Sequence, residues 1–368
     1  MLRRQFTRNA LGLPLAAALP SIPSLSSIAY GADLDPSVLP QGGSITDVPG
    51  LKVGHHTFTE RPTGCTVLIC EAGATAGVDV RGSAPGTRET DLLSPINSVQ
   101  QVQAILLSGG SAYGLDAASG VVRYLEEHNL GYKIGKIGVV PIVPAAILMD
   151  LGVGNFKIRP NADAGYKACL AASTGPVAEG NVGAGAGATI GKMFGPRFSM
   201  KSGLGTASVK IGDTGIVVGA LVAVNAVGDV VRPETGKVVA GARSEDGKGF
   251  RDSMAAMMNG YRVVVQNAAN TTIGVVATNA PFTKIQMTKI AQMAHDGYAR
   301  ALNPVHTMGD GDTIFSMSTG TAKVKADVTA IGAIAATVMA RAIVRAAMQA
   351  TSLPDLGLPA YRDYPGRS

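Results

Sequence analysis

The stretch NAANTTIGVVATNAPF, residues 267–282, decides how the rest of the chain is interpreted. Its run Thr271–Thr278 is rich in β-branched residues and has the composition of a buried strand. Another β-rich run, Tyr261–Gln266, precedes it. Polar Asn270 and two threonine hydroxyls stand at the start of the second strand. A turn would explain the asparagine, but it would leave the hydroxyls without a role.

A threonine hydroxyl is a weak nucleophile and needs a base. One solution is the residue's own α-amine, which is free only when the threonine is the first residue of its chain. For the internal Thr271 this requires cleavage of the Asn270–Thr271 bond. The hydroxyl would attack the preceding carbonyl, the acyl group would shift to oxygen, and water would release the new amino end. The residues alone leave this as one possibility beside an ordinary turn.

An acid-rich segment, HTMGDGDT (residues 306–313), follows some forty residues later. Asp310 and Asp312 are two residues apart, so in extended chain they face the same way and can approach one hydroxyl or amine. A solvated Gly-Asp turn is the alternative. A metal site is not expected, because the segment lacks the further acids and the terminal glutamate of a calcium loop.

The glycine run Gly180–Gly195 ends close to Lys192. A phosphate-binding loop is excluded, since Ala186 replaces its first glycine and Met193 stands where a magnesium-binding hydroxyl is needed. Two interpretations remain: a flexible or tightly packed loop, or close backbone packing that delivers Lys192 into a confined pocket. There the lysine would serve as an electrostatic stabiliser or as an acid–base group.

A serine triad is poorly supported. Residues 109–114, GGSAYG, do not match the GxSxG turn of α/β hydrolases. His295 lies away from the apolar face of its predicted helix, and we expect it to be solvated rather than to act as a base.

Strands and helices alternate throughout the chain, which predicts one α/β domain of packed sheet and helix layers. Helices are expected within residues 114–128, 282–302 and 326–350, the second opening with the capping box Thr283-x-x-Gln286. Strands are expected at Thr66–Cys70, Ala104–Leu107, Gly215–Val224 and Thr313–Ser318, beside the two already named.

Residues 1–32 have the layout of a secretory signal: Arg3, Arg4 and Arg8, then an apolar stretch, then small residues. The Arg-Arg-Gln-Phe order resembles a twin-arginine signal, which predicts a periplasmic or secreted protein with no membrane partner after export. Removing it lowers the net charge from +6 to +3 (6 − 3). No basic block with interleaved aromatics remains, so we expect no nucleic-acid partner. The three cysteines follow no CxxC pattern, and we expect buried free thiols.

Seven motifs spread over the mature chain give a resemblance to a known family. They are DVPGLKVGHHT, GSAPGTRETDLL, ILLSGGSAYGLDAASGV, VPIVPAAILMDL, AVNAVGDV, NTTIGVVATNAP and DGDTIF. The chain resembles the DmpA-type peptidases, which are autoprocessed N-terminal-nucleophile-like hydrolases. Asn-Thr-Thr-Ile and HTMGDGDT are similar to the NylC-type nylon-oligomer (6-aminohexanoate oligomer) hydrolases of that family, whereas PGTRETDLL is closer to its aminopeptidases.

The resemblance implies a four-layer αββα sandwich, commonly assembled as a homotetramer of processed heterodimers. Residues 33–270 would form the large chain and residues 271–368 the small one, with Asn270 before the cut and Thr271 as the nucleophile.

The resemblance also implies roles for five further residues. Lys192 corresponds to the catalytic lysine, and Asn225 to the asparagine that polarises the substrate carbonyl. Asp310 and Asp312 match the acidic pair near the amine and hydroxyl of the nucleophile, and Tyr113 matches a tyrosine that lines the substrate site. No metal or organic cofactor is implied.

We therefore expect an exported amidohydrolase that forms an acyl-enzyme on Thr271. Its substrates would be 6-aminohexanoate oligomers or short peptides. The alternative within the family is an L-aminopeptidase or β-peptidyl aminopeptidase. A non-catalytic periplasmic binding protein is the alternative outside it, and it predicts one intact polypeptide.

Overall fold

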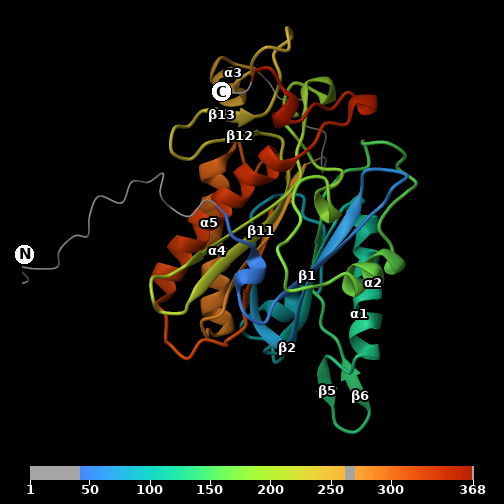
Figure 1. Ribbon diagram of the computed structural model, residues 1–368, viewed down its shortest axis with the longest axis vertical. Helices are drawn as coiled ribbons and strands as arrows, with labels where there is room; N and C mark the ends of the chain where they lie inside the picture. The colour runs from blue at the N-terminus through green and yellow to red at the C-terminus, as the bar shows by residue number, and fades with distance from the viewer. Residues whose placement is uncertain (1–41, 262–269, 367–368) are drawn as a thin grey trace, which may run out of the picture. The chain divides into compact units, whose positions relative to one another are not determined.

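The strand that begins at Thr271 lies in the middle of the sheet structure (Figure 1). In the computed structural model, which describes residues 42–261 and 270–366, it is β14 (Thr271–Thr278). β14 pairs antiparallel with β11 (Val217–Asn225) on one side and parallel with β16 (Thr313–Ser318) on the other. All eight residues of β14 are buried, as the run of β-branched residues predicts.

One long strand, β2 (Gly64–Val80), links two halves of a nine-stranded arrangement. Its later part pairs with β16, and its earlier part pairs with β4 (Val102–Ser108) and β1 (Lys52–Thr57). The register with β4 shifts between Ile69 and Ala74, where the strand passes from one sheet to the other. The remaining members are β7 (Ala145–Ile147) and β3 (Thr87–Arg88) at one end, and β10 (Leu204–Lys210) at the other.

Three apolar clusters separate four layers. The middle cluster fills the space between the two sheets, with Leu68 and Ile105 from one and Ile273 and Phe315 from the other. Because strand side chains alternate, the neighbouring residues of each strand face outward. Helices α1 (Ala117–Glu127) and α2 (Ala162–Leu170) cover one outer face, and α4 (Lys284–Ala301) and α5 (Val328–Gln349) cover the other (Figure 1). The expected αββα sandwich is therefore confirmed.

Helix α5 is long and apolar enough to span a bilayer, judged by length and composition alone. In the fold it packs on α4, β10 and β11, and its apolar side chains are part of the core beneath the sheet. It is therefore a helix of the protein core.

The remaining elements are short. They are the pairs β5–β6 (Tyr132–Ile134, Gly138–Val140) and β8–β9 (Thr189–Ile190, Met200–Lys201), the small sheet of β12, β13 and β15 (Asp229–Val231, Val238–Ala240, Leu302–Asn303), and helix α3 (Ser253–Met258).

The predicted strands and helices inside the described residues are confirmed, as is the capping box at Thr283. The three cysteines are free and buried, as expected. The predicted signal, residues 1–32, and the strand expected at Tyr261–Gln266 fall, apart from Tyr261, outside the described residues. The expectation of a solvated His295 is wrong: its side chain is fully buried on α4, where Nε2 lies 3.0 Å from the carbonyl oxygen of Asp79.

Candidate active site

Thr271 faces the space between the two sheets at the first position of β14. Its side chain points to the opposite face of the sheet from that of Thr272 and to the same face as that of Ile273. Ile273 belongs to the apolar core between the two sheets. Asn225, the last residue of β11, is its partner in the antiparallel register. Partners in such a pair project to the same face. The strand pairing therefore brings the predicted nucleophile and the predicted carbonyl-polarising amide together.

The bond before Thr271 has the contacts that a hydroxyl attack would need. The Thr271 hydroxyl donates to the carbonyl oxygen of Asn270 in a short contact. The backbone N–H of Gly311 donates to this same carbonyl oxygen at 3.2 Å and to Thr271 Oγ1 at 3.2 Å. One amide thus points at both oxygens of the Asn270–Thr271 junction, where negative charge would develop.

Gly311 reaches this position because the acid-rich loop is held by backbone bonds. Asn270 and Asp310 form a parallel bridge. On the other side of the loop, the N–H of Gly82 donates to the carbonyl of Asp312 at 3.2 Å, and that of Ala84 donates to the carbonyl of Asp310 at 2.8 Å. A Cβ on Gly311 would lie 2.6 Å from the carbonyl oxygen of Ala84. Only glycine fits between this segment and the nucleophile.

Asp310 and Asp312 are both buried, but they differ in how many of their carboxylate oxygens accept hydrogen bonds. Asp312 uses both: Oδ1 accepts the Thr272 N–H at 2.7 Å, and Oδ2 accepts from the backbone N–H of His306 at 3.1 Å and lies 2.9 Å from its Nδ1. Asp310 uses one: Oδ2 accepts from the backbone N–H and the hydroxyl of Thr307. Asp310 Oδ1 is buried without a hydrogen-bond partner among the described residues.

The pKa of Asp310 is raised to about 6, mainly by burial and then by the negative charge of Asp312. The hydrogen bonds from Thr307 and the charge of Lys192 act in the opposite direction. A carboxyl that titrates near neutrality, with one oxygen unused, is suited to exchange a proton with a neighbouring hydroxyl or amine.

Lys192 and Asn225 form one hydrogen-bonded unit. The Lys192 ammonium donates to the carbonyl oxygen of Asn225 at 2.9 Å and to its Oδ1 at 2.8 Å. Asn225 Oδ1 also accepts the backbone N–H of Thr189 at 3.0 Å, and its Nδ2 donates to the carbonyl of Met149 at 2.9 Å. The pKa of Lys192 is lowered to about 7, because the effect of burial outweighs the opposing effect of the Asp310 and Asp150 charges. The lysine therefore lies within the electrostatic reach of the acid loop.

The glycine run that carries Lys192 is a packed loop. Buried Lys201, on β9, donates to the carbonyls of Gly185 and Ala188 at 3.1 Å each, and also to the carbonyl of Ser202. These bonds hold the backbone of the loop in place just before Thr189, the residue whose N–H donates to Asn225. Lys201 gives no signal in the sequence, because its hydrogen-bond partners among the described residues are backbone carbonyls.

A fully buried ion pair beneath the site was also missed. Arg61 donates to Asp150 Oδ1 at 2.7 Å, and Thr63 donates to Oδ2 at 2.7 Å. Asp150 directly follows Met149, the residue that accepts from Asn225. The sequence signal is limited to Asp150, an acid that follows the apolar run of residues 145–149, and its partner Arg61 is 89 positions away.

Tyr113 does not belong to this hydrogen-bonded group in the part of the chain that the structure describes. The residue is 58% exposed, and its ring lies under the guanidinium of Arg159, with 3.8 Å from Cζ to the ring centroid. Its assignment to substrate binding stays a prediction. Residues 42–261 and 270–366 hold no group of three or more His, Cys, Asp or Glu side chains arranged for a metal ion.

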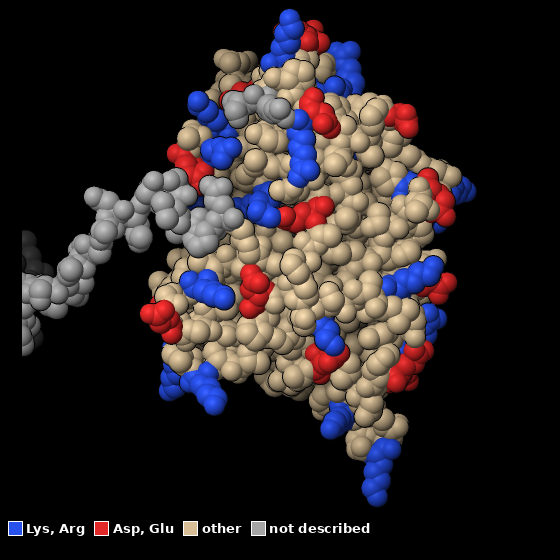
Figure 2. Space-filling model, in the orientation of Figure 1, with Lys and Arg blue, Asp and Glu red and all other residues tan. Residues whose placement is uncertain are grey.

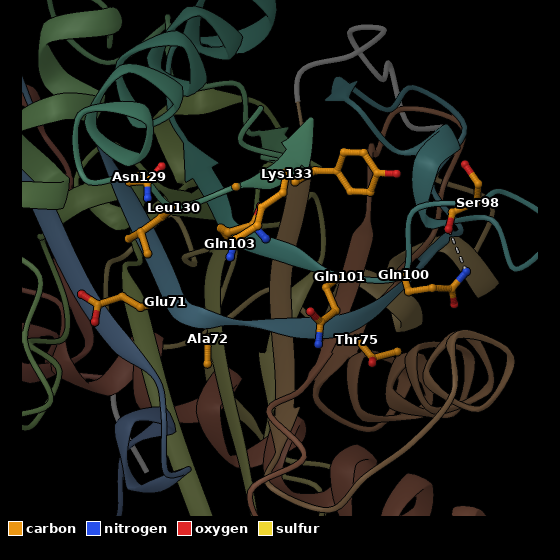
Figure 3. Close-up of a pocket in the computed structure, with 12 residues that line it drawn as sticks. Glu71, Ala72, Thr75, Ser98, Gln100, Gln101, Gln103, Asn129, Leu130 and Lys133 are labelled. Carbon is orange, nitrogen blue, oxygen red and sulfur yellow. Dashed lines mark hydrogen bonds between the residues drawn. The ribbon is translucent and has the colours of Figure 1, made fainter. Parts of the chain in front are cut away.

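A polar cavity of about 620 Å³ lies elsewhere, between β2 and the start of β5 (Figure 3). Its lining includes Glu71, Gln101, Gln103 and Lys133, and none of the residues around Thr271. The chemistry is therefore assigned from the hydrogen-bonded group at Thr271 and not from this cavity.

Comparison with known proteins agrees with the fold. The model of peptidase family S58 matches residues 43–357. An uncharacterized aminopeptidase of Mycobacterium bovis is 43% identical over 350 residues, which cover 88% of this chain and 98% of the relative. A 6-aminohexanoate-oligomer endohydrolase of Kocuria sp. is 31% identical over 319 residues, covering 82% of this chain and 85% of the relative.

Two solved structures share the fold at lower identity. The L-aminopeptidase D-Ala-esterase/amidase of Ochrobactrum anthropi, described as a variant of the Ntn hydrolase fold, superposes with a TM-score of 0.65 at 20% identity, over 89% of this chain and 94% of that one. A Burkholderia sp. β-aminopeptidase superposes with a TM-score of 0.64 at 23% identity, over 88% and 89%.

Proposed function

Because the chain belongs to peptidase family S58 and is a hydrolase of amide bonds, we propose that it matures by cutting its own Asn270–Thr271 bond and then acts through Thr271. The observation that carries this proposal is the set of contacts at the junction. The Thr271 hydroxyl lies against the Asn270 carbonyl, and the Gly311 N–H points at both oxygens.

In the cutting step, Thr271 Oγ1 attacks the Asn270 carbonyl carbon and the C–N bond breaks. The hydroxyl proton passes to the departing nitrogen, and we assign Asp310, with its unused Oδ1, as the group that relays it. Water then hydrolyses the ester, which leaves the Asn270 carboxylate and a free Thr271 amine.

In turnover, the Thr271 amine accepts the hydroxyl proton as Oγ1 attacks the substrate carbonyl. Lys192 and the amide of Asn225 stabilise the oxyanion, since the strand pairing holds them beside Thr271. The substrate amine leaves with a proton, and water hydrolyses the acyl-enzyme.

We infer linear amides with a free amino end as substrates, either 6-aminohexanoate oligomers or short peptides. The endohydrolase relative supports the oligomers, and the more similar mycobacterial relative supports an aminopeptidase. Parallel assays on 6-aminohexanoate oligomers and on amino-acid nitroanilides separate the two. Turnover of the nitroanilides alone would contradict the oligomer assignment. Export through the N-terminal segment and assembly as a homotetramer are part of the same proposal.

Variants at two neighbouring threonines test the nucleophile. Thr271→Ala removes the hydroxyl that faces the inter-sheet space, whereas Thr272→Ala changes a side chain on the opposite face of β14. We expect the first variant to stay uncut and inactive, and the second to be cut and active. Equal activity of the Thr271→Ala variant and the wild type would contradict the proposed function.

A further inference from the structure

Two adjacent residues of one loop hold the two acids of the site. His306 contacts Asp312 through its backbone N–H at 3.1 Å and through its ring Nδ1 at 2.9 Å. Thr307 contacts Asp310 in the same twofold way, through its backbone N–H at 3.0 Å and through its hydroxyl. Among the described residues, neither makes a hydrogen bond with Thr271. Each carboxylate therefore has one oxygen held by a backbone donor and a side-chain donor together.

The His306 ring has little freedom in this position. It packs edge-on against His295, with 4.8 Å between ring centroids, and roughly parallel to Tyr298 at 5.9 Å. Its Nε2 is buried without a hydrogen-bond partner among the described residues, so Nδ1 makes the polar contact of the ring. A carboxylate can only accept, so a hydrogen bond from the ring to an ionised Asp312 requires the proton to be on Nδ1.

His306 is connected to the nucleophile through Asp312. The other oxygen of Asp312 accepts the N–H of Thr272, the residue that follows Thr271. A shift of the Asp312 carboxylate would move the first peptide unit of β14 and, with it, Thr271. The line His306, Asp312, Thr272 is thus a physical connection of hydrogen bonds and backbone.

We propose that His306 and Thr307 are the positioning residues of this site: His306 orients Asp312 to fix the start of β14, and Thr307 orients Asp310 so that its Oδ1 faces the reacting groups. This inference rests on the proposed function, because it assigns the two residues to the acids that serve Thr271. It adds two side chains outside the predicted catalytic set.

The backbone at His306 supplies well-matched test variants. Its φ is 56°, in the left-handed region that Asn, Asp and Gly tolerate better than other residues. His306→Asn keeps an N–H donor close to the position of Nδ1. His306→Asp has the same shape but places a negative charge against Asp312. His306→Gly keeps only the backbone donor.

We expect His306→Asn to keep kcat within about threefold of wild type, and His306→Gly to lower kcat by about 10²-fold with little change in KM, as for a misplaced reacting group. His306→Asp should lower kcat at least as much. All three are assayed after their thermal unfolding has been compared with that of the wild type. Equal kcat in all three, or a change in KM alone, would overturn the assignment of His306.

Thr307 gives an independent arm if the His306 variants fail to fold. Thr307→Ser keeps the hydroxyl that reaches Asp310, whereas Thr307→Val keeps the shape and loses the hydroxyl. We expect kcat to be retained in the first and lost in the second, and equal kcat would overturn the assignment of Thr307. If Thr271→Ala is inactive but kcat is unchanged in the variants of His306 and Thr307, only the assignment of these two positioning residues is contradicted. An active Thr271→Ala would contradict the proposed function with it.

Discussion

At the scale of single residues, the site separates two acids that look equivalent in the sequence. Asp310 and Asp312 are two positions apart in a Gly-Asp-Gly-Asp run, and both are buried. Only their surroundings distinguish them. Asp312 has donors on both oxygens, whereas Asp310 has an unused oxygen and a raised pKa. We therefore propose that Asp312 anchors the start of β14 and that Asp310 is the group that moves a proton.

This division predicts how self-cleavage depends on pH. Before the cut, the Thr271 nitrogen is an amide and does not titrate. Asp310 must then be ionised to accept a proton, so the cutting rate should fall as the pH drops through about 6. In Asp312→Asn the neighbouring charge that raises the pKa of Asp310 is gone, so the midpoint should move to lower pH. The measurement is the cut fraction of freshly translated precursor on gels across pH, and an unchanged midpoint would contradict the division.

At the scale of elements, the local patterns predicted much of what the structure shows. β-branched runs predicted β14 and β16 with their observed bounds, and the capping box predicted the start of α4. Periodicity and caps are short-range signals, so they can be read from neighbouring residues.

The loop contacts could not be predicted in this way. The backbone bonds between the Gly82–Ala84 segment and the Asp310–Asp312 loop join positions over 220 residues apart, and Lys201 contacts only carbonyls. The family resemblance identified the acids and the lysine. It did not identify what holds them, and the helical pattern at His295 was misjudged because its surroundings come from β2 and the His306 loop.

The acid-loop contacts predict the effect of one added methyl group. In Gly311→Ala, the new Cβ would lie 2.6 Å from the carbonyl oxygen of Ala84 and 2.9 Å from Thr271 Oγ1. We expect self-cleavage to slow by about 10²-fold, because the loop must shift away from the nucleophile. Gly152→Ala is the control, since nothing lies within 4 Å of its Cβ. Mass spectrometry gives the uncut fraction of both, and equal fractions would show that the loop tolerates the shift.

At the scale of the whole molecule, the site depends on the meeting of two sheets. β11 and β14 supply Asn225 and Thr271 from one sheet, and the segment after β7 supplies the carbonyl of Met149 from the other. On the face shown in Figure 2, Lys and Arg side chains are interspersed with Asp and Glu. Arg61 and Asp150, in contrast, are fully buried, and the charge of Asp150 acts on Lys192.

The buried pair predicts a large loss of stability when one partner is removed. Arg61→Met leaves the Asp150 carboxylate buried without its counter-charge, and we expect unfolding to become easier by about 3–5 kcal/mol. Lys52→Met breaks the exposed pair with Glu71 and should change the free energy of unfolding by less than about 1 kcal/mol. Denaturant titrations measure both, and equal losses would contradict the importance of burial.

The central claim is that Thr271 must become an amino terminus before it can act. Denaturing mass spectrometry of active enzyme tests it most directly, with hydrolysis assayed on the same sample. We expect two pieces, the smaller of 98 residues (368 − 270) beginning at Thr271. Full activity in a sample whose residues 270 and 271 are still joined would contradict it.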